Sequence, residues 1–311
     1  MTPSVVLGII VLAHRNPQQL ALLLRSLSHD RVRLYLHVDA GVDFSPFRHA
    51  LAQPEVPQFD LLPRFRTRWG GVEVVDATLA GMARAIADGC GYILLISGQD
   101  YPLWDTERIV SFFAETPERS YLSHFSLPDA RWRYEGRLRT DFYTYTIMDR
   151  RETCIPAGEH VNLSGKGRML NQLLRLLSAF RPARHFPSCA RPFGGSQWWN
   201  MSKAAAAYVM EFVRDHPEYR AYHEHTLLPD EIFFQSILLG TSFADSQEII
   251  NDHMRFMVWD SEASHPETLG RRHLSSLLTR DKPFARKFDL ELDRSVAEAL
   301  DEAHASAGEP S

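Results

Sequence analysis

Continuous apolar runs alternate with segments of helical periodicity up to about residue 125. Runs that are apolar throughout predict a parallel sheet covered on both faces. Expected strands lie at 5–13, 32–39, 59–63, 92–97 and 120–125. Asn16-Pro17 predicts an N-cap and a first-turn proline for a leucine-striped helix, and further helices are expected at 73–87 and from Thr106. Such repeated βα units predict a Rossmann-like nucleotide-binding half, with ligand at the carboxyl ends of the strands.

The second part of the chain changes character. Residues 126–160 carry a dense run of Arg, Asp, Tyr and Trp, which predicts a long functional loop region. Periodic and apolar segments then resume, with expected helices at 166–180, 203–214 and 228–238, and expected strands at 195–202 and 254–259. The last dozen residues are rich in Ala, Ser, Glu and Gly, and they predict a frayed tail.

Composition excludes some classes of protein. A chain of 311 residues that is 44% hydrophobic can bury a large core, and its net charge of −5 argues against a nucleic-acid binder. The longest apolar run, at 5–13, is far shorter than the ~20 residues needed to cross a bilayer. No basic leader precedes it, so we expect a cytoplasmic protein without a transmembrane segment. Cys90, Cys154 and Cys189 lack metal-ligand spacing and are odd in number, which favours reduced structural thiols.

Polar residues follow the expected strands where a ligand would lie. Asp39 ends the second strand, where a carboxylate can accept hydrogen bonds from a ribose or can simply cap the next turn. His14 and Arg15 follow the first strand and allow the same two interpretations. No G-x-G-x-x-G follows that strand, which disfavours a dinucleotide cofactor and an oxidoreductase. Asp100, in "ISGQDYPL", is a single acid where metal-dependent sugar transferases place two, so it is either half a metal site or part of a site that works without metal.

Four short motifs each allow a functional and a structural interpretation. Trp69 in "RWGG" precedes a helix whose N-terminus suits an anion, although two glycines also make a tight turn. "PDE" puts Asp230 and Glu231 in a first helical turn, where acids suit the helix dipole and only one of two neighbours can face a pocket. "FARKFD" frames two cations with aromatic rings, which favours a diphosphate site over a solvated pair. "HEH" at 223–225 is discounted as a metal site, because alternate residues share one side only on a strand.

Taken in order, these motifs resemble one family. The set runs "VLAHRNPQQL", "YLHVDA", "RWGG", "ILLISGQDYPL", "GGSQWW", "LLPDEIFFQSIL", "NDHMRFMVW", "SHPETL" and "FARKFD". Over about residues 5–290 it resembles the Core-2/I-branching glycosyltransferases, which include β-1,6-N-acetylglucosaminyltransferases and peptide O-xylosyltransferases. The resemblance implies a GT-A-type fold, a UDP-sugar donor, inversion at the anomeric carbon and independence from metal, with no cofactor. We accordingly divide one large α/β domain into a nucleotide-sugar-binding Rossmann-like half (1–125), an acceptor-binding and catalytic half (126–290), and a C-terminal helix with a frayed tail (291–311).

The resemblance also implies roles for particular residues. Glu231 matches the acid that acts as base in the branching enzymes. The residues that match donor-binding positions are His14, Arg15 and Asp39 at the uridine, Trp69 and Asp100 lining the pocket, and Arg286 and Lys287 at the diphosphate.

One departure from the family concerns the acceptor. Xylosyltransferases carry an acid where this chain has Gln197, and glutamine cannot act as a base. Glu231 must then work alone, which favours a sugar hydroxyl over a peptide serine. Acceptor contacts are expected from Arg131, Arg133, Tyr134 and Trp198, although Trp198 also suits the core.

The resulting hypothesis is a glycosyltransferase. We expect it to move GlcNAc or xylose, from UDP-GlcNAc or UDP-xylose, in β linkage to a glycan or lipid-linked oligosaccharide. The expected location is the cytoplasm, with peripheral contact at the inner membrane. The alternative is a non-catalytic nucleotide-sugar-binding regulator or scaffold.

Overall fold

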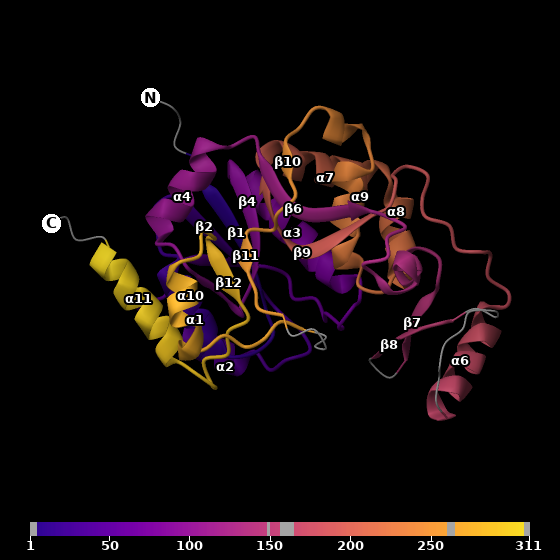
Figure 1. Cartoon of the computed structure of the whole chain (residues 1–311), viewed down its shortest axis with the longest axis horizontal. Coiled ribbons are helices and arrows are strands. Elements are labelled where there is room, and N and C mark those ends of the chain that lie inside the picture. Colours follow the sequence, from indigo (N-terminus) through magenta and orange to yellow (C-terminus); the bar gives the residue numbers. More distant parts are fainter. Residues whose placement is uncertain (1–4, 148–149, 156–164, 260–264, 308–311) are drawn as a thin grey trace.

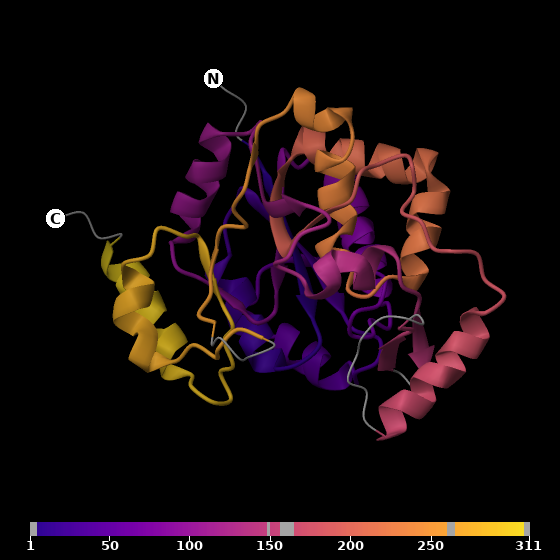
Figure 2. The same cartoon turned by 45° about the vertical axis from the view of Figure 1, so that its right-hand side comes forward.

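The fold is built on one seven-stranded mixed sheet with helices on both faces (Figure 1, Figure 2). The computed structural model describes residues 5–147, 150–155, 165–259 and 265–307. The strand order in the large sheet is β10-β6-β9-β4-β1-β2-β3. This arrangement confirms the expected α/β fold with helices covering a sheet, and the sheet is mixed because one inner strand runs antiparallel to its neighbours.

The centre of the sheet is parallel. β1 (Leu7–Ala13) lies between β2 (Val32–Val38) and β4 (Tyr92–Ser97), and β3 (Phe59–Leu61) adds the outer strand. Every residue of β1 and β4 is buried. Because both faces of these strands are covered, consecutive positions carry apolar residues, and this is the pattern visible in the sequence.

The other side of the sheet includes a strand from much later in the chain. β9 (Phe193–Ser202) lies between β4 and β6 (Ser120–Ser126) and is antiparallel to both. β10 (Ile249–Ile250) pairs with the outer edge of β6. Gly195 is needed for this close pairing, because a Cβ there would lie 1.8 Å from the Ser123 carbonyl oxygen, beside an irregularity in β6. The two halves of the chain therefore share one sheet.

Alternate residues of β1 point into two apolar clusters on opposite faces of the sheet. Ile9 and Val11 belong to the first cluster and Ile10 and Leu12 to the second. The first cluster is covered by α1 (Pro17–Ser26), α2 (Ser45–Leu51), α4 (Thr106–Glu115) and α11 (Ser295–Ala307). The second is covered by α3 (Glu73–Ala87), α7 (Lys203–Asp215) and α9 (Phe233–Leu239).

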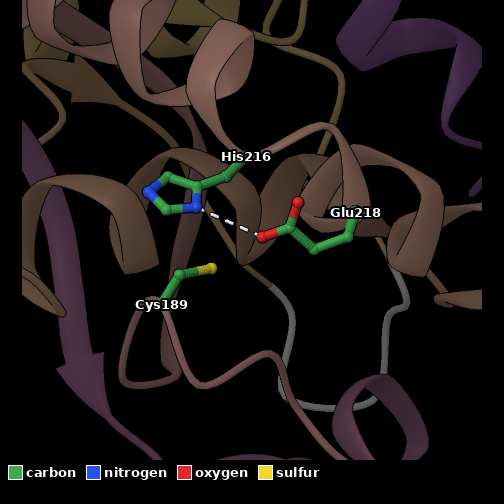
Figure 3. A group of neighbouring side chains, drawn as sticks. All are labelled: Cys189, His216 and Glu218. Carbon is green, nitrogen blue, oxygen red and sulfur yellow. Dashed lines mark hydrogen bonds and ion pairs between the residues drawn. The ribbon is translucent and has the colours of Figure 1, made fainter.

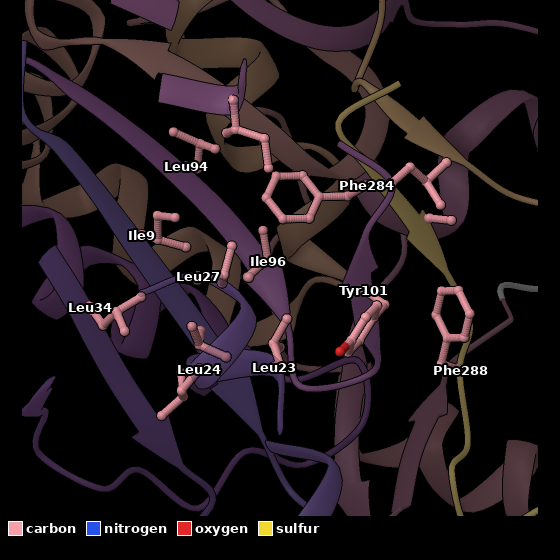
Figure 4. Packing of buried hydrophobic residues seen from close by; sticks show 14 of the residues in the cluster. Ile9, Leu23, Leu24, Leu27, Leu34, Leu94, Ile96, Tyr101, Phe284 and Phe288 are labelled. Carbon is pink, nitrogen blue, oxygen red and sulfur yellow. The ribbon is translucent and has the colours of Figure 1, made fainter. Parts of the chain in front are cut away.

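Figure 4 shows how α1 packs into the first cluster, where its leucines lie against the sheet and near Tyr101 and Phe284. The expected leucine stripe and the first-turn Pro17 are confirmed. The expected N-cap is wrong. Asn16 has φ 51°, makes no side-chain cap, and instead donates from its amide to Asp289 Oδ1 at 2.7 Å. The Asn16 side chain therefore binds Asp289, which is distant in the sequence, and does not cap the helix.

Three short strands form a second, smaller sheet. β5 (Asp100–Pro102) pairs antiparallel with β12 (Phe284–Arg286), which also pairs with β11 (Arg255–Phe256). β5 is not among the strands expected from the sequence, and the strand expected at 254–259 is shorter in the structure. Pairing with β12, which is distant in sequence, creates β5.

Residues 126–160 contain more regular structure than the expected loop. A 3₁₀ turn η1 (Arg133–Gly136) leads into α5 (Arg137–Thr140), and β7 (Thr144–Ile147) and β8 (Arg150–Thr153) form a hairpin. α6 (Gly165–Ser178) follows and extends from the body of the molecule beside this hairpin (Figure 1). Part of the expected loop, at 148–149 and 156–160, lies outside the described residues.

The remaining elements connect these parts. They are α8 (Pro217–Tyr222), η2 (His223–His225), η3 (Pro229–Glu231), η4 (Ser242–Asp245), η5 (Arg271–His273) and α10 (Leu274–Leu278). The expected frayed tail is wrong up to Ala307, where α11 ends, because Val296 and Leu300 bury one side of that helix. The rest of the tail, 308–311, lies outside the described residues.

Candidate active site

A cavity of about 710 Å³ opens at the carboxyl ends of β1, β2 and β4, where the sequence predicts a ligand. This volume suits a small-molecule ligand. The cavity carries three tryptophans, Trp69, Trp198 and Trp259, in its walls. Its polar lining residues include His14, His37, Asp39, Arg66, Thr67, Arg68, Ser97, Gln99, Ser196, Gln197, Asp230, Glu231, His265, Arg286 and Lys287.

Asp39 lines the cavity directly after β2 and is almost fully buried. One carboxylate oxygen accepts a hydrogen bond from the backbone N–H of Gly41, and the other accepts from the N–H of Thr67 at 2.8 Å and from its hydroxyl. Asp39 therefore holds the adjacent turns and also faces the cavity, so the two interpretations of this acid are compatible.

His14 and Arg15 separate after β1. His14 lines the cavity, and burial together with the neighbouring Arg15 charge lowers the pKa of its imidazole, which favours the neutral form at pH 7. Arg15 does not line the cavity but forms an ion pair with Asp289. In this structure the Arg15 guanidinium binds a carboxylate of the C-terminal segment, and its contact with a donor stays a prediction.

Trp69 is 75% exposed at the rim of the cavity, in the turn closed by a hydrogen bond from the Gly71 N–H to the Arg68 carbonyl. Gly70 has φ +71°, which explains the glycine. Its carbonyl accepts a hydrogen bond from the Leu228 N–H at 3.1 Å. The "RWGG" turn therefore both positions Trp69 and braces the segment that carries the two acids.

Asp230 and Glu231 both line the cavity, which corrects the expectation that only one could do so. They lie in the isolated 3₁₀ turn η3 and not in the first turn of an α-helix, because Ile232 has a non-helical φ of −135° before α9 begins. Leu228 enters this turn with φ 51°, a strained value for leucine. The turn as a whole projects its two carboxyls into the cavity.

The two carboxyls have different environments. Glu231 forms an ion pair with the buried Arg139, whose guanidinium lies 3.8 Å from the centroid of the Trp132 ring. Within the described residues, Asp230 Oδ1 has no hydrogen-bond partner. Burial, and then the neighbouring Glu231 charge, raise the pKa of Asp230 to about 7. Burial raises the pKa of Glu231 as well, and the Arg139 cation opposes that rise. The cation therefore favours Glu231 as the ionised member of the pair, and an ionised carboxylate can act as a general base.

Arg286 and Lys287 also line the cavity, and their charge is opposite to that of a carboxylate. The guanidinium of Arg286 lies 4.2 Å from the centroid of the Trp198 ring. Burial lowers the pKa of Lys287, and the Arg15 and Arg286 charges lower it further. Neighbouring cations that repel one another would be stabilised by an anion in the cavity.

Asp100 does not line the cavity, which corrects its expected place in the pocket wall. It is fully buried in β5, opposite Arg286 in the β5–β12 pairing. Its carboxylate lies 3.0 Å from Arg286 and 3.7 Å from Arg255, and it accepts a hydrogen bond from the Ser97 N–H at 3.2 Å. Asp100 is therefore the counter-ion that holds Arg286 from behind.

The expected acceptor residues divide into two groups. Trp198 lines the cavity, whereas Arg131, Arg133 and Tyr134 do not, and their contacts with an acceptor stay a prediction. Arg131 forms two 2.8 Å hydrogen bonds with Asp129, and Arg133 lies over the Tyr134 ring. These cations find local partners within the compact turn, so they do not extend to the cavity.

Several functional candidates were not distinguished in the sequence. Arg139 was one of many arginines in the run 126–160, and only its pairing with Glu231 distinguishes it. Arg255 is fully buried behind the cavity, and burial lowers its pKa to about 10. It lies in the motif "NDHMRFMVW", but the sequence indicated no role for it. Gln197, by contrast, is already singled out in the sequence, and it lines the cavity.

The "HEH" segment is not a surface pair of histidines. His223 is fully buried and burial lowers its pKa well below the usual value, while His225 packs against Tyr143. Across the part of the chain that the structure describes, the three-residue group with metal-ligand spacing is Cys189, His216 and Glu218, which lies outside the cavity. No described helix is both long enough and apolar enough to span a membrane.

Comparison with known proteins gives one family and a set of distant relatives. The family described as Core-2/I-branching enzyme matches residues 9–280. Xylosyltransferase 2 of Homo sapiens is 22% identical over 96% of this chain and 34% of its own length, and xylosyltransferase oxt of Drosophila melanogaster is 23% identical over 79% and 26%. The chain thus spans about a third of the length of the curated relatives it matches. A solved 4-diphosphocytidyl-2C-methyl-D-erythritol synthase from Anaerococcus prevotii aligns with a TM-score of 0.37 at 10% identity, covering 79% of this chain and 86% of that one.

Proposed function

The chain belongs to the Core-2/I-branching enzyme family, and on this basis we propose that it is an inverting glycosyltransferase of GT-A type. It moves GlcNAc or xylose from a UDP-sugar to a hydroxyl of a glycan acceptor in β linkage. The observation that carries this proposal is a cavity at the ends of three parallel strands with a carboxyl pair on one wall and a cation pair on another. These are the two kinds of group that the reaction requires.

Glu231 is the proposed base. In a single in-line displacement, the acceptor oxygen bonds to the anomeric carbon while the bond from that carbon to UDP breaks, and the hydroxyl proton passes to the base. The Arg139 cation favours the ionised form of Glu231 before the reaction. Gln197 lines the cavity but cannot accept a proton, which supports a sugar hydroxyl as acceptor.

Arg286 and Lys287 are proposed to neutralise the charge that develops on the diphosphate. Most enzymes of this fold use a divalent metal for that purpose, whereas fixed cations positioned in advance supply the same stabilisation. Asp100 and the Trp198 ring hold the Arg286 guanidinium, so little reorganisation accompanies the reaction. The proposed mechanism therefore needs no metal.

The uridine is proposed to lie near Asp39 and His14, with Trp69 at the rim. Asp39 has fixed carboxylate oxygens, and His14 offers a neutral imidazole, both suited to hydrogen bonds with a nucleoside. The alternative of a non-catalytic nucleotide-sugar-binding protein shares these contacts but has no use for the base.

The membrane surface is the proposed location of a lipid-linked acceptor. α6 exposes Met169, Leu173 and Leu176, which are 70%, 49% and 69% exposed and follow one another at helical spacing. Phe180, in the turn just after the helix, is 97% exposed. Segment 165–181 contains four Lys and Arg residues and no acid. An apolar stripe with basic neighbours suits an anionic lipid surface.

The other side of α6 is attached to the protein. The Asn171 amide bonds to the Ile155 backbone at 2.8 and 3.1 Å, and Ser178 bonds to the Tyr145 hydroxyl at 2.7 Å. In co-sedimentation, vesicles with anionic lipid should retain the protein and neutral vesicles should not. Leu176→Glu should abolish retention and Gln172→Glu should reduce it less. Equal retention by both vesicle types, or self-association through the stripe, would contradict this membrane contact.

A transfer assay tests the proposed base. Glu231→Gln should lower the rate by about 10²–10⁴-fold with nearly unchanged UDP affinity, because the amide cannot accept the proton. Glu224→Gln, which removes an exposed carboxylate in the neighbouring turn η2, is the matched control. Wild-type transfer by Glu231→Gln would refute the base assignment, and bound UDP-sugar without transfer or hydrolysis in the unchanged protein would support the non-catalytic alternative.

Three further measurements test the donor site and the metal-free mechanism. Lys287→Ala should weaken UDP binding by about tenfold to hundredfold, the cost of one charge-assisted hydrogen bond. Activity lost with EDTA and restored by manganese would contradict the metal-free mechanism. A thermal-shift panel of UDP-GlcNAc, UDP-xylose, UDP-glucose and UDP-galactose identifies the donor, because binding stabilises the folded state.

A further inference from the structure

Three potential metal ligands gather at a place that has no role in the proposed reaction. Cys189, His216 and Glu218 each offer one ligand atom, and these atoms lie within 4.8 Å of one another. His216 Nδ1 and Glu218 Oε1 are 3.2 Å apart. Figure 3 shows the Cys189 sulfur pointing toward the space between the imidazole and the carboxylate. None of the three lines the large cavity.

The backbone fixes two of these ligands at a helix junction. His216 ends α7, where its N–H bonds to the Phe212 carbonyl at 2.8 Å, and Pro217 begins α8 directly afterwards. The imidazole also packs on the Phe212 ring, with centroids 4.6 Å apart. Glu218 follows in the first turn of α8, so the junction presents a nitrogen and an oxygen on one side.

Cys189 comes from a different part of the chain. It belongs to the turn that precedes β9, closed by a hydrogen bond from the Ala190 N–H to the Pro187 carbonyl, and it packs against the second apolar cluster. The side chain is partly buried, while the Glu218 carboxylate is 61% exposed. Backbone packing therefore places the thiol, and the carboxylate can rotate toward it.

We propose that Cys189, His216 and Glu218 bind one zinc ion, with water as the fourth ligand. Zinc bonds of about 2.3 Å to sulfur and about 2.0 Å to nitrogen and oxygen, at tetrahedral angles, separate ligand atoms by about 3.3–3.6 Å. The imidazole and carboxylate already have this separation. The sulfur needs to approach by about 1 Å at most, a movement that rotation of the Cys189 and Glu218 side chains can supply.

The ligand set selects the metal. A thiolate with an imidazole suits zinc, whereas magnesium, calcium and manganese prefer oxygen ligands. On binding, the Cys189 thiol releases its proton to solvent, and the thiolate and carboxylate together balance the charge of the ion. The two remaining cysteines, Cys90 and Cys154, are buried elsewhere and do not share the site.

The bound ion would join two segments that are distant in sequence. It links the turn before β9 to the α7–α8 junction, and β9 carries Ser196, Gln197 and Trp198 into the cavity wall. The ion has a structural role, because it holds the start of the strand that lines the cavity, and it takes no part in the proposed sugar transfer. The proposal stands independently of the proposed function.

Metal binding can be measured directly on the whole protein. After chelation and removal of the chelator, cobalt(II) should bind with one equivalent and give a sulfur-to-cobalt charge-transfer band, and zinc should displace it. Zinc should also raise Tm. Cys189→Ser should abolish the band and weaken zinc binding by about a hundredfold or more, because one of the few protein ligands is lost.

Matched variants keep the interpretation clear. Glu211→Gln, an exposed acid on α7 with an Arg214 partner, should leave cobalt and zinc binding unchanged. Glu218→Gln lies in an exposed turn and should weaken zinc binding even if Cys189→Ser fails to fold. A missing charge-transfer band, or equal zinc affinity in the unchanged protein and in both ligand variants, would overturn the proposal. Since the site is remote from the cavity residues, removal of zinc should lower Tm without abolishing transfer below it.

Discussion

Replacement of Asp230 by asparagine should change how stability depends on pH. Asp230 is buried beside Glu231, and burial with that like charge raises the pKa of Asp230 from 3.8 to about 7. The proton belongs to the interacting pair of carboxyls, so either one can carry it at a given moment. Asp230→Asn keeps the shape of the side chain and removes one of the two titrations.

The sign follows from the direction in which the pKa moves. The folded protein binds this proton more tightly than the unfolded chain, so its free energy of unfolding falls as the pH rises from about 4 to about 7. A tenfold difference in proton affinity between the folded and unfolded states corresponds to about 1.4 kcal/mol. Between about pH 5 and about pH 8 the unchanged protein should lose about 2–3 kcal/mol from this group.

Urea unfolding at these two pH values measures the effect. Relative to the unchanged protein, Asp230→Asn should gain about 2–3 kcal/mol of stability between the lower and the higher pH, and the difference should vanish only below about pH 4. Glu118→Gln, which removes an exposed acid in the turn before β6, is the control and should leave the profile unchanged. Parallel profiles for Asp230→Asn and the unchanged protein would refute the idea that this buried carboxyl retains a proton near neutral pH.

Three other substitutions test the supports of the site. Arg139→Gln removes the cation that lowers the pKa of Glu231, so the rise of kcat/KM with pH should move to higher pH, and an unmoved profile would contradict the pairing. Asp100→Asn leaves Arg255 and Arg286 buried without their counter-ion and should cost about 3–5 kcal/mol of stability in urea, whereas a loss below about 1 kcal/mol would contradict this role. Phe284→Ala, at a fully buried position in the first cluster, should cost about 3–5 kcal/mol, and a smaller loss would mean that the cluster refills the space.

The large elements could be predicted because their signals are local. The helix expected at 73–87 has the same bounds as α3, and the apolar runs became β1, β2 and β4. Uniformly apolar runs and helical periodicity are patterns of neighbouring residues, so they can be recognised without knowledge of distant contacts.

Features that depend on distant contacts could not be predicted in this way. β5 exists because β12, more than 180 residues away, pairs with it, and the role of Asp100 depends on the same pairing. Arg15 forms an ion pair with Asp289, which is distant in the sequence, so no local sequence pattern indicates this partner. By contrast, Asp129 lies two residues before Arg131, so the local pairing of that arginine was readable in the sequence.

The roles of the two acids in "PDE" depended on backbone detail. The sequence left open which of Asp230 and Glu231 faces the cavity, because a helical first turn points neighbours in different directions. The non-helical Ile232 separates the turn from α9, and Arg139 distinguishes the two carboxyls. The contact between Glu231 and Arg139, which composition does not reveal, therefore distinguishes the two carboxyls.

The position of β9 between β4 and β6 has a consequence for synthesis on the ribosome. Translation adds about 5–20 residues per second, so about 4–15 s pass between completion of β6 at Ser126 and arrival of β9 at Ser202. During that interval one edge of β4 and both edges of β6 have no neighbour, because β10 follows even later in the chain, and such edges invite pairing with other chains. The half-built sheet should therefore need chaperones to cover its open edges, and slower translation across 127–192 should lower the yield of soluble protein because it prolongs this exposure.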